Sequence, residues 1–237
     1  MELIGVLSGS LIMQKSDIAD CREETVKTKY GKASVLLTDK IALILRHGRD
    51  PAKYILPHLI NHRANLQALK DLGTTEVVGI NSTGSLKREL YPGMVVIPDD
   101  FITLTSTPTI FQDKAVHITP ALDENVRQKL ISAVTFCKIS FAAKGIYWQV
   151  TGPRLETKAE IRMMANFADV VGMTMANEAV IARELELPYA SACSIDNFGN
   201  GIVDQPLSLE EIIDGTRKNS AAMIRLLESY CTISSGK

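Results

Sequence analysis

Short runs of apolar, often β-branched residues recur along the whole chain, and helical patterns lie between them. Several runs are continuous rather than alternating, as expected for strands that are buried on both faces of a sheet. The runs cover residues 4–7, 33–37, 41–45, 77–80, 94–97, 143–148, 170–173 and 189–195. Helices are predicted over residues 58–72, 157–167, 177–187 and 208–230. This interleaving predicts a single three-layer α/β domain over residues 1–237, with a central mixed β-sheet flanked by helices.

The charge balance limits the partners that the chain can have. Its 237 residues carry a formal net charge of −1, and 22% of them are charged. Nucleic acids and anionic membranes usually bind proteins with a basic excess, so neither is expected as a partner. No apolar run approaches the length that spans a bilayer. The four cysteines show no C-x-x-C pair and no metal-ligand spacing, which favours reduced thiols in a cytoplasmic protein without a bound metal.

Five short polar segments could meet in one pocket of such a fold. They cover residues 8–10, 46–48, 81–85, 152–156 and 172–174. The first three directly follow strand-like runs, and the ends of strands are where open α/β sheets bind ligands. Small hydroxyls, glycines, one arginine and one histidine suit an oxyanion such as phosphate. The segments together therefore predict a phosphate site.

Each segment also has a simpler interpretation when it is taken alone. The turn with Ser10 is also an ordinary connection from strand to loop, and Arg46 with His47 also suits a solvated surface turn. Asn81 and Ser82 add an amide and a hydroxyl after a third strand. Three such segments, each following a strand, favour an anion site more than any one of them does.

Glu156 and Asn197 are candidates for reading the edge of a heterocycle. A carboxylate accepts a hydrogen bond from a ring N–H, and a carboxamide both donates and accepts. The alternatives are that Glu156 is a favourable charge at a helix N-terminus and that Asn197 forms a turn. Met173 and Thr174 follow a further strand, and methionine there is usually a core residue.

Several of these segments match a known family in their order along the chain. The motifs are Arg46-His47-Gly48, Asn61-His62-Arg63-Ala64-Asn65, Gly84-Ser85-Leu86 with Pro92-Gly93, Gly152-Pro153-Arg154 with Glu156-Thr157, Gly172-Met173-Thr174, and Glu178-Ala179. From Ile4 to about Glu211, the chain resembles the trimeric purine nucleoside phosphorylase and methylthioadenosine phosphorylase family. The resemblance implies reversible phosphorolysis of a purine nucleoside by a homotrimer. It implies no cofactor, since inorganic phosphate is a co-substrate.

The resemblance also implies roles for individual residues. The phosphate-binding set is Ser10, Arg46, His47, Asn81, Ser82 and Thr174. Met173 would pack against the ribose, and His47 and Asn197 would act in catalysis. The substrate set further includes Glu156, Leu155, Phe198, Gly199 and Leu209. Leu155 stands where the family has a phenylalanine that stacks on the base.

Two positions imply the base that is recognised. Members that act on adenine nucleosides have an aspartate at the position of Asn197 and a small hydroxyl residue at that of Glu156. The pair found here resembles members specific for 6-oxopurines, in which the glutamate accepts the N1 proton.

The residues at the start of the last predicted helix imply which group the sugar of the substrate carries at its 5′ end. Leu209 stands where ordinary purine nucleoside phosphorylases have a histidine, and Ile212 and Ile213 follow. Aliphatic residues there suit a methylthio group, although they also fit the core stripe of a helix. His117 is expected to line this end from a neighbouring subunit, or to be a simple loop histidine.

Together these features predict S-methyl-5′-thioinosine as substrate, with inosine or guanosine as second choices. An S-methyl-5′-thioadenosine phosphorylase and a non-catalytic nucleoside-binding protein remain as alternatives.

Overall fold

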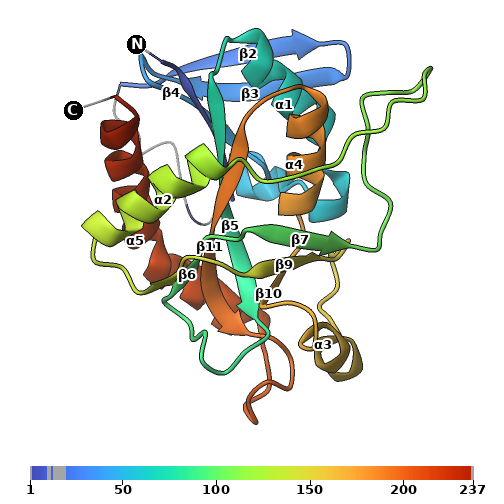
Figure 1. Ribbon diagram of the computed structural model, residues 1–237, viewed down its shortest axis with the longest axis vertical. Helices are drawn as coiled ribbons and strands as arrows, with labels where there is room; N and C mark the ends of the chain where they lie inside the picture. Colours follow the sequence, from blue (N-terminus) through green and yellow to red (C-terminus); the bar gives the residue numbers. More distant parts are fainter. Residues whose placement is uncertain (1, 10–11, 13–19, 236–237) are drawn as a thin grey trace.

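The computed structural model describes residues 2–9, 12 and 20–235. Within them, eleven strands form one mixed sheet, shown in Figure 1. Its main path runs through β2 (Arg22–Thr28), β3 (Gly31–Leu37), β4 (Ile41–Leu45), β1 (Ile4–Ser8), β5 (Glu76–Ser85), β10 (Val170–Gly172), β9 (Ile146–Gln149) and β7 (Asp100–Thr103). On the other side of β5 the sheet continues with β11 (Tyr189–Phe198), β6 (Val95–Val96) and β8 (Phe141–Ala142).

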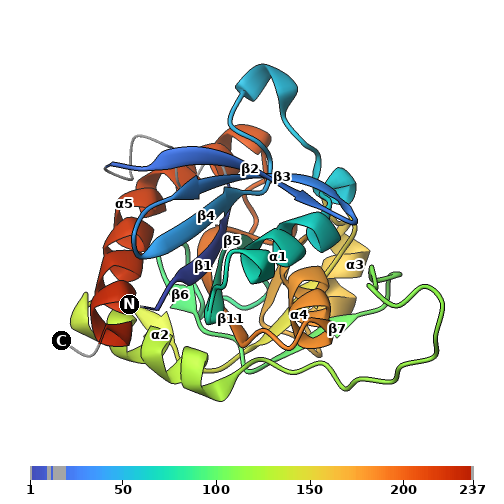
Figure 2. The ribbon, with the colours of Figure 1, turned by 90° about the horizontal axis from the view of Figure 1, so that it is seen from above.

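Helices cover both faces of this sheet. Those of the described residues are α1 (His62–Asp71), α2 (Glu124–Phe136), α3 (Lys158–Met164), α4 (Met175–Glu184) and α5 (Leu209–Ser234), with 3₁₀ turns η2 (Pro51–Lys53) and η3 (Pro57–Leu59). Figures 1 and 2 show α1 and α4 on one side and α2 and α5 on the other. The predicted α/β class, with a central mixed sheet flanked by helices, is confirmed.

The central strands are buried on both faces, as their continuous apolar sequences predicted. Val6 and Leu7 are neighbours in β1, and both side chains are fully buried. Val6 belongs to the apolar cluster under α2 and α5, whereas Leu7 belongs to the one under α1 and α4. Alternate side chains of one strand therefore pack into two apolar cores on opposite faces of the sheet, and this fixes the register of the strand.

The register of the parallel strands gathers polar segments at one level of the sheet. Ser8 at the end of β1 pairs with Leu45 at the end of β4 and with Ile80 in the middle of β5. The backbone N–H of Arg46, the residue after β4, donates to the Ser8 carbonyl at 2.9 Å. The first, second and third polar segments therefore begin side by side.

Two predicted loops are parts of strands. Residues 81–85 were expected to follow a strand, but β5 continues through them to Ser85, and Asn197 lies inside β11 rather than in a turn. These polar residues continue as strands because β5 pairs with β11 on one side and with β10 on the other. Asp196 forms a bulge in β11, since Ile195 pairs with Thr83 and Asn197 with Gly84.

The helix boundaries also differ from the prediction. α1 begins at His62 rather than at residue 58, because Pro57–Leu59 form a 3₁₀ turn and the Asn61 side chain accepts from the Ala64 N–H at 3.1 Å. α4 begins two residues earlier than predicted, at Met175. The elements β2, β7, β8 and α2 were not predicted. Among the described residues, no helix combines the length and the apolar character that crossing a bilayer requires.

Candidate active site

The side chain of Arg46 is buried at the end of β4 and forms an ion pair with Glu178 of α4. Its Nε donates to Glu178 Oε1, and its Nη2 donates to Glu178 Oε2 at 2.9 Å. Nη1 donates to the carbonyl of Ile80 at 2.7 Å. Burial opposes the charge of Arg46, but the Glu178 carboxylate outweighs it and raises the pKa of the guanidinium. The arginine is therefore a fixed cation.

Asn81 connects this arginine to the beginning of α4. Its Oδ1 accepts from Arg46 Nη2 at 3.3 Å, and its Nδ2 donates to Thr174 Oγ1 at 2.7 Å. Thr174 is the residue before α4, so the N-terminal end of a helix faces the same place. Three residues of the predicted phosphate set therefore form one hydrogen-bonded group at the positive end of the α4 dipole.

Two side chains from β9 cap the N-terminus of α4. The hydroxyl of Tyr147 accepts from the Thr174 N–H at 3.2 Å. Gln149 Oε1 accepts from the Ala176 N–H at 2.6 Å. Because these capping groups come from the sheet, they fix the position of Thr174 against β5.

His47 follows Arg46 and is held by the segment after η2. Its Nδ1 lies 2.7 Å from the Ile55 carbonyl, and its ring stacks on Tyr54 with centroids 4.5 Å apart. A carbonyl only accepts, so Nδ1 carries the hydrogen, and Nε2 of the neutral ring is an acceptor. Burial, with a contribution from Arg46, lowers the pKa of His47 and favours that neutral ring.

Ser82 is exposed in β5 and faces α5. Its Oγ lies 3.5 Å from Thr216 Oγ1, and Thr216 donates to Asp196 Oδ2 at 2.7 Å. The other Asp196 oxygen accepts from Ser194 at 2.5 Å and from Asn219 at 2.8 Å. The bulged aspartate therefore ties α5 to the strands that carry the site.

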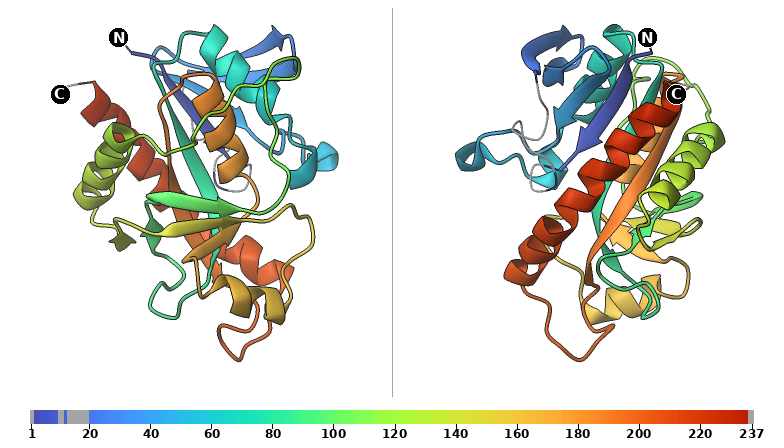
Figure 3. Two further views of the ribbon diagram at one scale, coloured as in Figure 1. Left: turned by 45° about the vertical axis from the view of Figure 1, so that its right-hand side comes forward. Right: turned by 90° about the vertical axis from the view of Figure 1, so that its left-hand side faces the viewer.

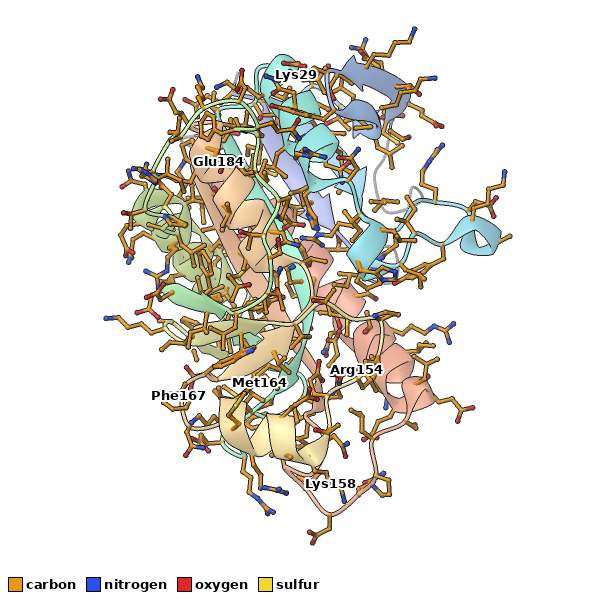
Figure 4. All side chains as sticks on the ribbon, turned by 90° about the vertical axis from the view of Figure 1, so that its right-hand side faces the viewer. Lys29, Arg154, Lys158, Met164, Phe167 and Glu184 are labelled. Carbon is orange, nitrogen blue, oxygen red and sulfur yellow. The ribbon has the colours of Figure 1, made fainter. Side chains whose placement is uncertain are left out.

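Asn197 and Glu156, the predicted base-reading residues, are both buried. Asn197 Nδ2 donates to the Phe198 carbonyl at 2.8 Å, and within the described part of the chain no group donates to its Oδ1. Burial raises the pKa of Glu156. The neighbouring Arg154 is bound to Glu160 at 2.7 and 2.8 Å. Figure 4 shows Lys158 by α3 near the end of the molecule opposite Lys29, with Arg154 in the same half of the molecule.

The remaining members of the predicted substrate set differ in their burial and contacts. Met173 packs against Gly152, because a Cβ added to Gly152 would lie 2.4 Å from the Met173 Sδ. Residues 152–156, which include Glu156, therefore begin beside Met173. The Gly199 N–H donates to the Ser85 carbonyl at 2.7 Å, which holds the half-buried Phe198 beside the end of β5. Leu155 is exposed. Ser10 lies outside the described residues.

Residues 4–232 match the model of a family described as the phosphorylase superfamily. The chain belongs to this superfamily.

Curated relatives in the superfamily cover nearly the whole chain. A probable 6-oxopurine nucleoside phosphorylase of Archaeoglobus fulgidus is 40% identical over 231 residues, which are 95% of this chain and 94% of the relative. A probable S-methyl-5′-thioinosine phosphorylase of Methanocaldococcus jannaschii is 38% identical over 244 residues, with coverage of 99% and 94%. A methylthioadenosine phosphorylase from Schistosoma mansoni in complex with adenine has a similar fold, with a TM-score of 0.92, 24% identity and coverage of 100% and 93%.

The region expected to receive the sugar 5′ end starts with exposed residues in this superfamily member. Leu209, the first residue of α5, is 68% exposed, and Ile212 and Ile213 are half-buried. The buried residues of α5 begin at Thr216. The alternative that Leu209 belongs to the core of its own chain is therefore wrong. His117 is exposed between β7 and α2, and it has no hydrogen bond or ion pair with the site residues that the structure describes.

Sequence reasoning missed the residues that support this site. Glu178 belongs to a matched motif but was given no role, and Tyr189, whose hydroxyl donates to Glu178 Oε2 at 2.8 Å, was not considered. Asp196 and Thr216 were also missed as links to α5. The one available signal for Glu178 was its charge within the apolar pattern of α4. Its partner Arg46 is distant in sequence, so the ion pair could not be predicted from spacing.

Proposed function

We propose that this protein cleaves the N-glycosidic bond of 6-oxopurine nucleosides with inorganic phosphate. S-methyl-5′-thioinosine is the favoured substrate, and the products are hypoxanthine and methylthioribose 1-phosphate. The observation that carries the proposal is the hydrogen-bonded group of Arg46, Asn81 and Thr174 at the N-terminus of α4, and the burial of Asn197 and Glu156 supports it. The names of the relatives from Archaeoglobus and Methanocaldococcus support the same reaction.

The chemistry needs no nucleophile from the protein. Phosphate attacks the anomeric carbon while the bond from that carbon to the purine breaks, and the electron pair of the broken bond passes to the purine. Arg46, His47, Ser82 and Thr174 hold the phosphate, together with Ser10 and Asn81. Positioning and electrostatic stabilisation then supply the catalysis.

Asn197 and Glu156 act on the base in this proposal. The Asn197 amide donates to the purine as negative charge develops on it, and such a donor typically contributes about 10²–10³ in rate. The ionised Glu156 accepts the N1 hydrogen that a 6-oxopurine carries and adenine lacks. A site with a buried acceptor left unpaired rejects the wrong base, by roughly 10⁴-fold.

The assembly proposed is a homotrimer in the cytoplasm, with purine nucleoside and phosphate as its small-molecule partners. Exposed apolar side chains on this single chain, such as Leu59 and Leu104, support association with further copies.

S-methyl-5′-thioadenosine phosphorylase is the second candidate. The aliphatic residues at the start of α5 favour a methylthio sugar and do not select the base. Glu156 and Asn197 oppose adenine.

The deciding experiment compares S-methyl-5′-thioinosine, S-methyl-5′-thioadenosine, inosine and guanosine, each with and without phosphate. We expect phosphate-dependent release of the base, fastest from S-methyl-5′-thioinosine. Faster turnover of S-methyl-5′-thioadenosine would favour the second candidate. Absence of release from all four would leave a nucleoside-binding protein without catalysis.

A further inference from the structure

His62 is a buried imidazole whose ring nitrogens have no partner. It is the first residue of α1 and is 4% exposed. Within the described part of the chain, neither Nδ1 nor Nε2 makes a hydrogen bond. Buried polar atoms are nearly always hydrogen-bonded, because leaving one unpaired costs about 1–3 kcal/mol. This side chain therefore needs an explanation that packing alone does not give.

The groups that face His62 are those of the phosphate site. Its Nδ1 lies 3.9 Å from Glu178 Oε1. Arg46 and His47, both from the segment after β4, also act on its charge. The Glu178 oxygens are already bound by Arg46 and by the Tyr189 hydroxyl. His62 thus stands next to an ion pair rather than inside an apolar core.

This ion pair has a consequence for anion binding. The positive charge of Arg46 and the negative charge of Glu178 cancel, so the pair carries no net charge. A phosphate dianion that binds there brings two negative charges into a buried region. His62 and His47 are the neighbouring groups that can add a positive charge by taking up a proton.

We propose that phosphate and a proton on His62 bind cooperatively, so that the imidazole of this positioning residue becomes a cation when the anion enters the site. The inference rests on the proposed phosphorolysis and adds a proton-linked step to it. The proton comes from solvent and forms one N–H bond at Nδ1, on the side of Glu178. No other bond forms or breaks in this step.

The surroundings of His62 keep its imidazole neutral before an anion binds. Burial, with the positive charge of Arg46 and a smaller contribution from His47, lowers the pKa of His62 to about 4, against the opposing effect of Glu178. A nearby anion acts in the opposite direction, and charges within about 4–6 Å shift a pKa by about 1–3. By linkage, protonation then tightens phosphate binding by the same factor.

Titration calorimetry of inorganic phosphate tests the coupling. Phosphate is titrated at pH 6 into the wild type and into His62→Gln, which cannot become a cation, in two buffers of different ionisation enthalpy. His58→Gln is the matched control, because His58 is exposed in η3. The protonation of phosphate itself is common to all three proteins and cancels in the comparison.

We expect wild type and His58→Gln to take up more protons on binding phosphate than His62→Gln does. From pH 7.5 to pH 5.5, phosphate affinity of the wild type should rise about tenfold relative to His62→Gln, which corresponds to an upward pKa change of about 2.5 units from the starting value of about 4. Equal uptake and parallel pH profiles in all three proteins would overturn the role of His62. Absence of phosphate binding to the wild type would instead overturn the proposed function.

Histidine ring NMR of the wild type keeps the test independent of variant folding. The chain has four histidines, and His58→Gln and His117→Gln identify two of the signals by their loss. The two remaining signals belong to His47 and His62, and the His47 ring is recognised by its nuclear Overhauser contact with the stacked Tyr54 ring. Saturating phosphate should raise the midpoint of the His62 signal by about 2.5 units, and an unchanged midpoint would contradict the inference.

Discussion

At the scale of single residues, the buried pair of Arg46 and Glu178 determines what the site offers to a ligand. Removing two charges from water is expensive, and a buried pair often adds nothing to stability compared with apolar residues. Its benefit is geometric, because Glu178, the Ile80 carbonyl and Asn81 accept from four of the five N–H groups of the guanidinium and hold its plane in a fixed orientation. In the proposed function, the remaining Nη1 hydrogen is a donor for phosphate that needs no rearrangement.

Glu156 should make the choice of base depend on pH. Burial raises the pKa of this carboxyl, so it becomes protonated at a higher pH than an exposed glutamate. The protonated acid donates where the carboxylate accepted, which suits the N1 lone pair of adenine better than the N1–H of hypoxanthine. We expect the ratio of kcat/KM for S-methyl-5′-thioinosine over S-methyl-5′-thioadenosine to fall as the pH is lowered.

Glu156→Gln provides the comparison for this pH effect. A glutamine has a similar shape, and its amide both donates and accepts at every pH. The variant should discriminate between the two nucleosides less strongly, by about tenfold or more, and its ratio should not vary with pH. A pH dependence that persists in Glu156→Gln would show that another group controls the choice of base.

Asn197→Asp should shift the preference towards 6-aminopurines. A carboxylate accepts from the 6-amino group of adenine, whereas it repels the O6 and N7 acceptors of a 6-oxopurine. We expect the same kcat/KM ratio to fall by about 10–100-fold, the range of one charged hydrogen bond. Asn166→Asp is the matched control, because Asn166 is exposed after α3. An unchanged ratio in Asn197→Asp would mean that the base is read elsewhere.

The sequence predicted the groups of the site better than their connections. Arg46, Asn81 and Thr174 were assigned to one phosphate site, and the structure joins them by hydrogen bonds. Glu178 and His62 were missed because their importance comes from contacts between α4, α1 and the end of β4. Such contacts depend on how helices pack on the sheet, and no local spacing encodes them.

At the scale of elements, polar residues inside strands were the main source of error. β5 and β11 keep their pairing through polar positions such as Asn81 and Asn197, so a hydrophobic pattern ends too early. β2 was missed for a related reason. It is a charged edge strand, Arg22–Thr28, without buried side chains, and among the described residues it pairs with β3 alone. Its strand state comes from this hairpin partner rather than from apolar residues.

The first turn of α5 should decide the group tolerated at the 5′ end of the sugar. Leu209 is exposed, so replacing it disturbs little of the core of this chain. Leu209→His introduces a partner for a 5′-hydroxyl and removes apolar surface from a methylthio group, which is worth about 1–3 kcal/mol. We expect kcat/KM for inosine to rise about tenfold or more relative to S-methyl-5′-thioinosine.

Glu210→His is the control for this helix position. Glu210 is the next residue of α5 and is also exposed, so the same side chain is introduced about 100° around the helix. In Glu210→His, the ratio of kcat/KM for inosine to that for S-methyl-5′-thioinosine should match the ratio of the wild type. Equal effects of both variants would remove the argument that Leu209 contacts the sugar.

At the scale of the whole molecule, the layered arrangement followed from the alternation of buried strands and helices. Figure 3 shows α5 running along β11 on one side of the sheet, with α2 beside it. Gly215 permits this close approach, because a Cβ there would lie 2.0 Å from the Asp196 carbonyl oxygen. The sequence predicted the layers but not this contact, which depends on the absence of a side chain at one helix position.

The proposed homotrimer should have a mass three times that of one chain in light scattering after gel filtration. Leu104 follows β7 and is 76% exposed, in the segment that also carries His117. Leu104→Asp should weaken the assembly, because a charge would be buried in the interface. Phe136→Asp, at a residue that is 78% exposed at the end of α2, should leave it intact. A monomeric wild type would contradict this assembly.

The bulge at Asp196 directs the side chains of two consecutive residues of β11 to different partners. The aspartate is bound to α5 through Thr216 and Asn219, whereas the next residue, Asn197, pairs with Gly84 and stays available at the other side. In the proposed reaction, a substitution at position 197 can therefore alter recognition of the base while the hydrogen bonds that attach α5 to Asp196 are retained.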